Sequence, residues 1–459
     1  MKVSFYNIGC KVNFADVSEL REMLEKLGHS TVSFGDECDA VFINTCTVTN
    51  NADADARKII RKAVRTSPDA FIGVLGCYAQ LKPEDVAAIE GVDAVFGQNE
   101  KFKIPQLIDN FSKNDQTQVL VSGMEDIPFH TSCSSENEDR TRVFLKIQDG
   151  CEYVCTYCTI PMARGGNRSM DFADLIKYFT SLRDEDFYEV IISGINVGEY
   201  RAKTGEDFTD VVRFIDSAGI KQRIRISSIE PNKLKPEIIE IISKSKTFCP
   251  HFHIPLQSGS DDILKLMKRR YNSEYYKSLI LRIKNLMPDV CIGIDVIVGF
   301  PGETNDLFCE TYDFLDSLPF SYLHVFTYSE RDNTSAATYD GVVDRMTRKE
   351  RTKQLRQLSD KKRDEFYKSQ LGEVRTVIPE QYKEIPANDF SEIMGERQSN
   401  SPISISKPDE TIASENVLWE GWTENYVKVV FEAERSLEKI PHNVKLLELD
   451  KGKVFCEIV

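Results

Sequence analysis

Cys151-Glu-Tyr-Val-Cys-Thr-Tyr-Cys158 places three cysteines in a C-x3-C-x2-C pattern, directly after an apolar run that is typical of a strand. Three thiolates on one loop can hold three irons of a [4Fe–4S] cluster and leave the fourth iron without a protein ligand. An open metal position is typical of a reactive site, whereas structural metal sites are closed. The alternative is a zinc knuckle, which needs four ligands, often as paired C-x2-C halves, and only one such half is present here. The spacing therefore favours an iron–sulfur site.

The region around this loop repeats a strand–helix pattern. Six apolar runs that indicate strands lie at Val143–Ile147, Glu189–Ser193, Ile224–Ser228, His251–Leu256, Cys291–Val298 and Tyr322–Thr327. The stretches between them are long enough for right-handed crossover helices. Six such repeats in about 190 residues predict a partial (β/α)6 barrel rather than a flat sheet.

The first 100 residues show a second alternation of this kind. Strands are predicted at Val3–Ile8, Ala40–Asn44, Phe71–Gly76 and Ala94–Gly97, with helices at Asp16–Leu27, Ala52–Thr66 and Pro83–Glu90. Alternating strands and helices favour an α/β domain built on a parallel sheet, which binds ligands at the carboxyl ends of its strands.

Three further cysteines follow successive strands of this N-terminal sheet. Cys10 follows the first predicted strand, Cys46 the second and Cys77 the third. Because loops after parallel strands meet at one edge of the sheet, these thiols are placed to converge on a second metal cluster. Three buried core cysteines are the alternative. The other six of the 12 cysteines show no ligand spacing.

Composition divides the chain further. We predict an N-terminal domain at 1–122, a polar linker at 123–142, the barrel at 143–344, a basic helical connector at 345–372 and a small antiparallel β-barrel at 373–459. Residues 385–416 are rich in Ser, Pro, Asn and Glu and are expected to form an insertion in the last domain.

The whole 459-residue chain carries a net charge of −15, which excludes a uniformly basic nucleic-acid packaging protein but allows a local basic face. No apolar run approaches a membrane span, and no signal region precedes the first strand. We therefore expect a cytoplasmic protein that is not embedded in a membrane, with mostly reduced or metal-bound cysteines.

Together these cysteine motifs resemble the radical S-adenosylmethionine (SAM) methylthiotransferase family over nearly the whole chain outside the linker and insertion. Further matches are Ser193-Gly-Ile-Asn-Val-Gly198, Ser227-Ser-Ile-Glu-Pro231, His253-Ile-Pro-Leu-Gln-Ser-Gly-Ser260, Met267-Lys-Arg-Arg-Tyr271 and Asp295-Val-Ile-Val-Gly-Phe-Pro-Gly-Glu-Thr304. The resemblance implies that Cys151, Cys155 and Cys158 hold a catalytic [4Fe–4S] cluster whose free iron binds SAM. It also implies an auxiliary [4Fe–4S] cluster, tied to sulfur insertion, on Cys10, Cys46 and Cys77.

The resemblance implies a SAM site around the predicted barrel. Its expected members are Tyr157, Gly194, Asn196, Ser228, Glu230 and Gly299. Each of the last five has barrel packing or a turn as its alternative. His251 and His253 share one face of a strand and are expected to point inward as core or wall residues rather than as ligands.

The basic residues suggest where RNA binds. Arg57, Arg61 and Arg65 lie on one predicted helix, and the segment 345–368, which includes Arg348, carries ten basic residues against four acidic ones. These are candidates for phosphate contacts, with solvated helix faces as the alternative. Trp422 and Tyr426 are candidates for base stacking.

Three motifs indicate the branch of the family, and a fourth matches its C-terminal domain. Gly9-Cys-Lys-Val-Asn13, Asn44-Thr-Cys-Thr-Val-Thr49 and Ser227-Ser-Ile-Glu-Pro231 resemble the branch that acts on threonylcarbamoyladenosine in tRNA. Gly421-Trp-Thr-Glu-Asn-Tyr-Val-Lys-Val429 resembles the RNA-binding TRAM β-barrel of the family. Two features depart from the family pattern: Asn333 replaces a usual glycine, and residues 373–459 are acidic, with 10 Lys and Arg against 17 Asp and Glu.

The expected function is therefore 2-methylthiolation of N6-threonylcarbamoyladenosine next to the anticodon, by radical C–H activation, sulfur insertion and methyl transfer from SAM. Expected partners are tRNA and an electron donor such as flavodoxin or ferredoxin, and a monomer is expected by family likeness. Alternatives are a methylthiotransferase for isopentenyladenosine in tRNA or for a ribosomal-protein aspartate. From other classes, a non-catalytic iron–sulfur RNA-binding protein and an electron-transfer protein remain open.

Overall fold

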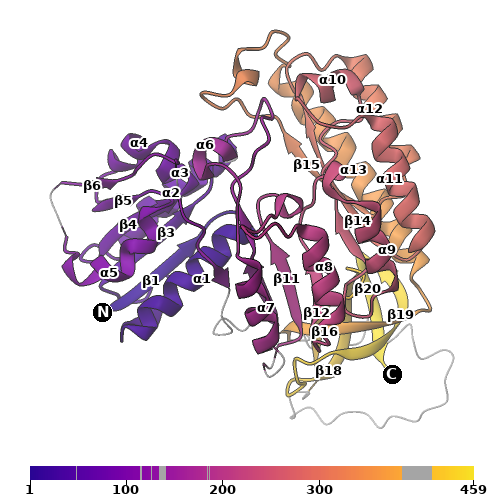
Figure 1. Ribbon diagram of the computed structural model, residues 1–459, viewed down its shortest axis with the longest axis horizontal. Coiled ribbons are helices and arrows are strands. Elements are labelled where there is room, and N and C mark those ends of the chain that lie inside the picture. Colours follow the sequence, from indigo (N-terminus) through magenta and orange to yellow (C-terminus); the bar gives the residue numbers. More distant parts are fainter. Residues whose placement is uncertain are drawn as a thin grey trace.

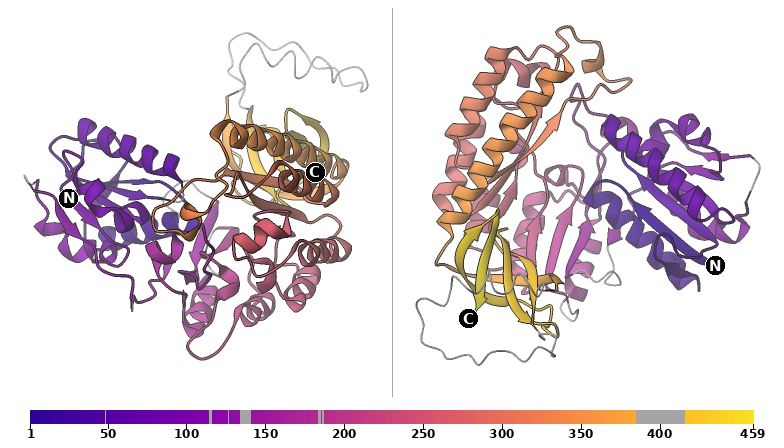
Figure 2. Two further views of the ribbon diagram at one scale, coloured as in Figure 1. Left: turned by 90° about the horizontal axis from the view of Figure 1, so that it is seen from above. Right: turned by 180° about the vertical axis from the view of Figure 1, so that it is seen from behind.

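The predicted strands form three β-structures in a computed structural model (Figure 1). An N-terminal α/β unit lies beside a larger partial barrel, and a small β-barrel lies at the lower end of that barrel (Figures 1 and 2). The structure describes residues 1–47, 49–113, 116–125, 127–133, 141–182, 185, 187–384 and 416–459. Among these residues, no helix has both the length and the apolar character needed to cross a membrane.

The N-terminal sheet is entirely parallel, in the order β2-β1-β3-β4-β5-β6. Its strands are β1 (Lys2–Asn7), β2 (Ser30–Val32), β3 (Ala40–Thr45), β4 (Phe71–Gly76), β5 (Ala94–Phe96) and β6 (Gln118–Leu120). The central strands β3 and β4 are buried throughout, which explains their continuous apolar runs. The four predicted strands are confirmed. The two edge strands, β2 and β6, were missed because each has only three residues, and all of these residues are at least partly exposed.

Helices cover both faces of this sheet: α1 (Lys11–Lys26), α2 (Asn50–Thr66), α3 (Cys77–Leu81), α4 (Pro83–Ala87) and α5 (Ile104–Leu107). The helix predicted at Asp16–Leu27 begins five residues earlier, because Cys10 serves as its N-cap in an extended conformation. The polar residues Asn13 and Asp16 are buried in this first part of α1, so the apolar pattern did not reveal it.

The central unit is a partial barrel of six parallel strands, as predicted. Its strands are β8 (Arg142–Lys146), β11 (Glu189–Ser193), β12 (Arg223–Ile226), β13 (His251–His253), β14 (Cys291–Val298) and β15 (Tyr322–Thr327). Two sets of three parallel strands are joined by isolated bridges, Ile224 to Phe248 and Ser228 to His253. On the far side β8 pairs with the antiparallel strand β7 (Ser132–Cys133), so the barrel is not closed by a β8–β15 pair in the described structure.

The helices of the barrel are α6 (Ile160–Arg164), α7 (Phe172–Ser181), α8 (Phe208–Ser217), α9 (Pro236–Lys244), α10 (Asp261–Leu266), α11 (Ser273–Leu286) and α12 (Asn305–Ser317). One face of each strand packs on these helices, with Leu145, Ile192 and Ile294 fully buried in the core between them. The alternate residues face inward and are largely polar, including Glu189, Asp295 and others described below. The barrel therefore has a polar interior.

The last helix and the C-terminal barrel close one end of the central unit. Helix α13 (Arg345–Ser369) leads into a closed barrel in the order β16-β17-β18-β20-β19, which confirms the predicted small β-barrel. The barrel is not antiparallel throughout as predicted, because β18 and β20 pair in parallel. Its strands are β16 (Val374–Lys383), β17 (Asn416–Thr423), β18 (Lys428–Glu434), β19 (His442–Asp450) and β20 (Lys453–Ile458). Asn416 begins β17, and the rest of the insertion predicted at 385–416 lies outside the described residues.

Arg223 and Arg225, at the amino end of β12, donate hydrogen bonds to backbone carbonyls of the C-terminal barrel, at Thr376 (3.0 Å) and Glu424 (3.1 Å). The Tyr426 ring lies 4.5 Å from His251 at the same end. The C-terminal barrel thus covers the amino ends of the central strands, and the carboxyl ends remain for chemistry.

Candidate functional site

The C-x3-C-x2-C loop lies at the carboxyl end of β8, between the short paired strands β9 (Gln148–Asp149) and β10 (Arg168–Ser169). The Cys151 N–H donates to the Gly165 carbonyl (3.1 Å), and Thr156 Oγ1 donates to the Leu266 carbonyl (2.9 Å). A side chain at Gly150, which has a φ of +72°, would collide with the Gly166 backbone. These contacts fix both ends of the loop and bring its three thiols to one place.

The environment of these thiols is buried and partly cationic. Burial raises the pKa of Cys158 to about 12 and also raises the pKa values of Cys151 and Cys155. The Arg269 guanidinium donates to Cys155 Sγ (3.1 Å) and opposes this shift. Metal binding deprotonates such thiols, and a cation beside them offsets part of the negative charge of a thiolate-bound cluster.

The structure brings Cys10, Cys46 and Cys77 together at the carboxyl edge of the N-terminal sheet. A Cβ on Gly9 would lie 2.8 Å from the Cys46 Cβ, so the backbone beside Cys10 touches Cys46. Burial raises the pKa of Cys77, and the Cys10 thiol is close enough to add to this shift. Cys10 itself is exposed, which leaves one side of the group accessible.

Arg164, in the helix that follows the C-x3-C-x2-C loop, links the two cysteine groups. Its Nη1 donates to Asp149 (2.8 Å) and its Nη2 to Asn13 Oδ1 (2.5 Å), three residues after Cys10. The same guanidinium hydrogen-bonds the Cys77 thiol and partly opposes the rise in its pKa that burial causes. One buried arginine therefore joins the auxiliary cysteines to Asp149, two residues before the C-x3-C-x2-C loop.

Of the residues predicted to bind SAM, Asn196 has the clearest ligand-like geometry. It is buried at 3% exposure, its backbone N–H donates to Gln148 Oε1 (2.8 Å), and neither atom of its side-chain amide has a hydrogen-bond partner in the described structure. Gly194 lies against the same glutamine, since a Cβ there would be 2.8 Å from its Oε1. A buried amide without a partner is costly, so Asn196 fits a bound polar ligand.

The other predicted members of the SAM site have protein partners. Glu230 forms an ion pair with Arg269, the same arginine that contacts Cys155. Tyr157 packs edge-on against Phe300, with ring centroids 6.3 Å apart. Gly299 has a φ of +77° and lies under the Arg348 side chain, which favours the packing alternative at this position. Asn333, which stands where the family usually has glycine, also adopts a positive φ (+65°).

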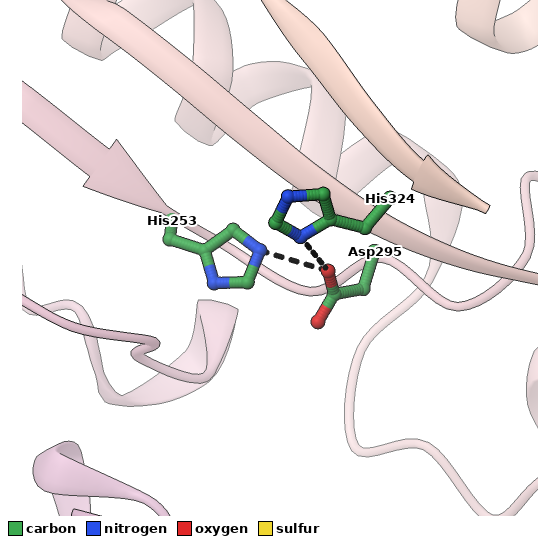
Figure 3. Close-up of side chains that lie close together, drawn as sticks. All are labelled: His253, Asp295 and His324. Atoms are coloured by element: carbon green, nitrogen blue, oxygen red, sulfur yellow. Dashed lines mark hydrogen bonds and ion pairs between the residues drawn. The ribbon is translucent and has the colours of Figure 1, made fainter. Parts of the chain in front are cut away.

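Inside the barrel, two histidines share one carboxylate (Figure 3). Asp295 Oδ1 accepts hydrogen bonds from His253 Nε2 (2.8 Å) and His324 Nδ1 (3.2 Å). Ser228, predicted to bind SAM, instead hydrogen-bonds His253 Nδ1. The ligand atoms of the triad lie within 4.8 Å of one another, and the two hydrogen bonds account for this closeness without a metal.

His251 and His253 point into the barrel, as predicted, and a third histidine there was not predicted. Burial and the nearby Arg225 hold the pKa of His251 well below its usual range, and its Nε2 lies 3.1 Å from the Tyr322 hydroxyl inside the barrel. His324 had no predicted role. The alternation of Tyr322, His324 and Phe326 along β15 was the available signal, because it puts these three side chains on the inner face.

The RNA candidates need two corrections. Arg348 is 8% exposed, and its guanidinium donates to the carbonyls of Val343 (2.8 Å) and Tyr328 (3.0 Å) and to Glu330 (2.5 Å), so it does not face solvent for a phosphate contact. Tyr426 was predicted to stack on bases, but its ring is packed between the two barrels, and Trp422 stacks on it at 4.4 Å.

Other basic side chains do face solvent. Arg61 and Arg65 on α2 are exposed, whereas Arg57 is half-buried and donates to the Tyr78 hydroxyl (3.1 Å). On α13 the exposed basic residues Arg345, Lys349, Lys353 and Arg356 follow helical spacing and form one stripe. Within the described part of the chain, none of these four side chains makes a hydrogen bond or ion pair.

Comparison with known proteins gives consistent results. The profile described as "Uncharacterized protein family UPF0004" matches residues 2–97, and that of the Radical SAM superfamily matches residues 145–315. The chain is 37% identical to the threonylcarbamoyladenosine tRNA methylthiotransferase MtaB of Bacillus subtilis (strain 168), over 97% of this chain and 94% of that protein. It is 32% identical to the tRNA-2-methylthio-N(6)-dimethylallyladenosine synthase of Fusobacterium nucleatum, over 88% of this chain and 93% of that protein.

Among solved structures, the radical SAM methyltransferase TsrM of Kitasatospora setae matches with a TM-score of 0.55 and 14% sequence identity. The match covers 73% of this chain and 77% of that chain. At this identity the likeness supports the fold alone, and it agrees with the partial barrel described above.

Proposed function

The chain belongs to the radical SAM methylthiotransferase family, and we propose that it converts N6-threonylcarbamoyladenosine next to the anticodon of tRNA into the 2-methylthio derivative. The observation that carries the proposal is the presence of two three-cysteine groups, of which the auxiliary one is joined through Arg164 to the segment that enters the C-x3-C-x2-C loop. The greater identity to the relative named for threonylcarbamoyladenosine favours that nucleoside over dimethylallyladenosine.

The cofactors of this reaction are two [4Fe–4S] clusters and SAM, and the residues present fit them. Cys151, Cys155 and Cys158 would hold one cluster, and Cys10, Cys46 and Cys77 the other. The unpartnered amide of Asn196 would bind SAM. When bound, the first cluster supplies the electron that cleaves SAM to a radical able to break an unactivated C–H bond, which no protein acid or base can do.

The residues of the chain position these groups and exclude water. Arg269 holds Cys155 and Glu230 at one side of the loop, and Arg164 holds the helix after the loop against the auxiliary cysteines. The C-terminal barrel covers the amino ends of the strands through Arg223 and Arg225. Substrate RNA therefore reaches the cysteines from the carboxyl side of the barrel.

The proposal is tested by mass spectrometry of digested tRNA nucleosides from a host that lacks methylthiotransferases, with and without this protein. We expect threonylcarbamoyladenosine to be replaced by its 2-methylthio form. Conversion of isopentenyladenosine alone would support the methylthiotransferase activity but reject threonylcarbamoyladenosine as the substrate. No methylthio nucleoside, despite measured iron on the protein, would reject the proposal.

We also propose that the exposed stripe on α13 and the exposed arginines of α2 contact the tRNA backbone. Replacing Arg345, Lys349 and Lys353 with glutamine should weaken tRNA binding and lower the slope of log affinity against log salt by about 2 to 3, about 0.9 per phosphate contact. Filter binding over a salt series measures this. Lys361→Gln on the same helix is the matched control, because Lys361 already pairs with Asp316. An unchanged slope in the triple variant would assign the stripe to solvent.

The remaining partners are part of the same proposal. A flavodoxin or ferredoxin would reduce the clusters, and the protein would act as a monomer in the cytoplasm, where tRNA is found.

A further inference from the structure

Lys11 presents an unpaired positive charge beside an auxiliary cysteine. It follows Cys10 directly and is the first residue of α1. Its side chain is exposed to a cavity of about 390 Å³, lined also by Cys10, Phe14, Phe144 and a second cation, Arg21. The Arg21 guanidinium lies over the Phe5 ring, 5.6 Å from its centroid. Within the described structure its ammonium makes no hydrogen bond or ion pair. The cavity volume lies in the range of small-molecule sites.

The charged groups around Lys11 leave its charge uncompensated. Arg142, Arg225, Glu189 and Asp295 are near enough to act on it electrostatically. Both carboxylates in this set already form ion pairs or hydrogen bonds with other side chains. Glu189 pairs with Arg223 and Arg225, and Asp295 accepts from two histidines.

The two arginines of this set also form ion pairs with carboxylates. Arg142 pairs with Glu380, and Arg225 pairs with Glu189 and donates to the carbonyls of Glu424 (3.1 Å) and Thr423 (3.3 Å). Lys11 is therefore the cation of this group whose charge is left for a ligand, and the ligand that would match it is an anion.

The nucleosides named for the relatives differ in charge at N6. The threonylcarbamoyl group ends in a carboxylate, whereas the dimethylallyl group is an uncharged hydrocarbon. Resting on the proposed function, we propose that Lys11 binds the threonyl carboxylate and selects this nucleoside. Lys11 directly follows Cys10, an expected ligand of the auxiliary cluster, so an adenosine brought to that cluster for sulfur insertion would come within its reach.

The same contact works against the wrong substrate. A dimethylallyl group in this cavity would remove water from the ammonium and give it no partner, which is unfavourable. A tRNA phosphate is the other anion that Lys11 could meet, and the experiment must separate the two sources.

The test compares two anticodon stem-loops that differ only at the threonyl group, one with its carboxylate and one with a neutral methylamide. Equilibrium binding and kcat/KM are measured for each. Wild-type protein should bind the carboxylate stem-loop about 10- to 100-fold more tightly than the methylamide stem-loop, which is the effect of one hydrogen bond to a charged group. Lys11→Met should reduce this preference to within about threefold, and Lys11→Arg should retain most of it. Lys26→Met, at the other end of α1, is the matched control and should behave as wild type.

Two outcomes would overturn the inference. Equal losses on both stem-loops in Lys11→Met would show that Lys11 affects the cysteine site without binding the carboxylate. Equal binding of both stem-loops by the wild type would assign Lys11 to a phosphate or to no anion. Failure of the proposed function looks different: the wild type would form no methylthio product from the threonylcarbamoyl stem-loop, whatever its binding preference. Iron content measured on each variant separates folding defects from these results.

Discussion

Replacing Cys155 with alanine should abolish the formation of 5′-deoxyadenosine from SAM. Two thiolates cannot hold three irons of a cluster, and the variant also leaves Arg269 without the thiol that it contacts at 3.1 Å. We expect the reconstituted variant to contain about four irons fewer per chain, since one of two four-iron clusters is lost. Anaerobic incubation with SAM and dithionite, followed by chromatography of the products, measures the reaction.

Two further variants make this result specific. Cys309→Ala is the matched control, because Cys309 is exposed on α12 and has no ligand spacing, and it should retain full activity. Cys46→Ala should keep SAM cleavage and lose methylthiolation, because Cys46 belongs to the auxiliary group. Persistent 5′-deoxyadenosine in Cys155→Ala would reject the assignment of the loop.

The parts of this site that follow from local sequence and sheet topology could be predicted. The runs at Ala40–Thr45 and Phe71–Gly76 are apolar because the strands are buried on both faces, so their type and order were readable. Once those strands are parallel, the loops after them must meet at one edge, which is why the convergence of Cys46 and Cys77 could be expected.

The errors concern side chains whose direction is set by distant parts of the chain. The segment 345–368 has few apolar residues, so its sequence did not show which basic residues face inward. Arg348 and Arg351 point inward because Glu330 and Glu303, far away in sequence, pair with them there. Tyr426 is covered for a similar reason, since the partner of its ring is His251 in another unit. His324 and Lys11 gained their importance only when the barrel and the N-terminal sheet came together.

Replacing Asp16 with asparagine should destabilise the protein by about 3 to 5 kcal/mol, the usual cost of removing one partner from a buried ionic network. Asp16 is fully buried where α1 meets the barrel. It accepts from Lys101 (2.6 Å), Lys146 (2.5 Å) and Ser132 Oγ (3.0 Å). The asparagine would fit the space but would leave the buried Lys101 ammonium without a carboxylate, and Lys146 with only its longer contact to Asp149 (3.4 Å). Urea unfolding at pH 7, followed by the change in midpoint, measures the loss.

The control for this variant is an exposed ion pair. Asp174→Asn removes the partner of Lys177 on α7, where both side chains are more than half exposed, and should cost at most about 0.5 kcal/mol. A cost for Asp16→Asn as small as that of Asp174→Asn would show that the network does not stabilise the contact between the N-terminal unit and the barrel.

The stability cost of Asp16→Asn should depend on pH in a definite direction. Burial alone would raise the pKa of Asp16, but Lys101, Lys146 and Arg164 hold it well below its usual range. A carboxyl with a lowered folded-state pKa contributes its full stability above the unfolded-state pKa of about 4 and loses it as the pH falls. The difference in the free energy of unfolding between wild type and Asp16→Asn should therefore stay constant from pH 7 to pH 5. Below pH 4 it should narrow by up to about 1.4 kcal/mol per pH unit, because only the wild type must take up a proton at this site in order to unfold. A gap that widens in acid would contradict the assignment of Asp16 as the ionised member of the network.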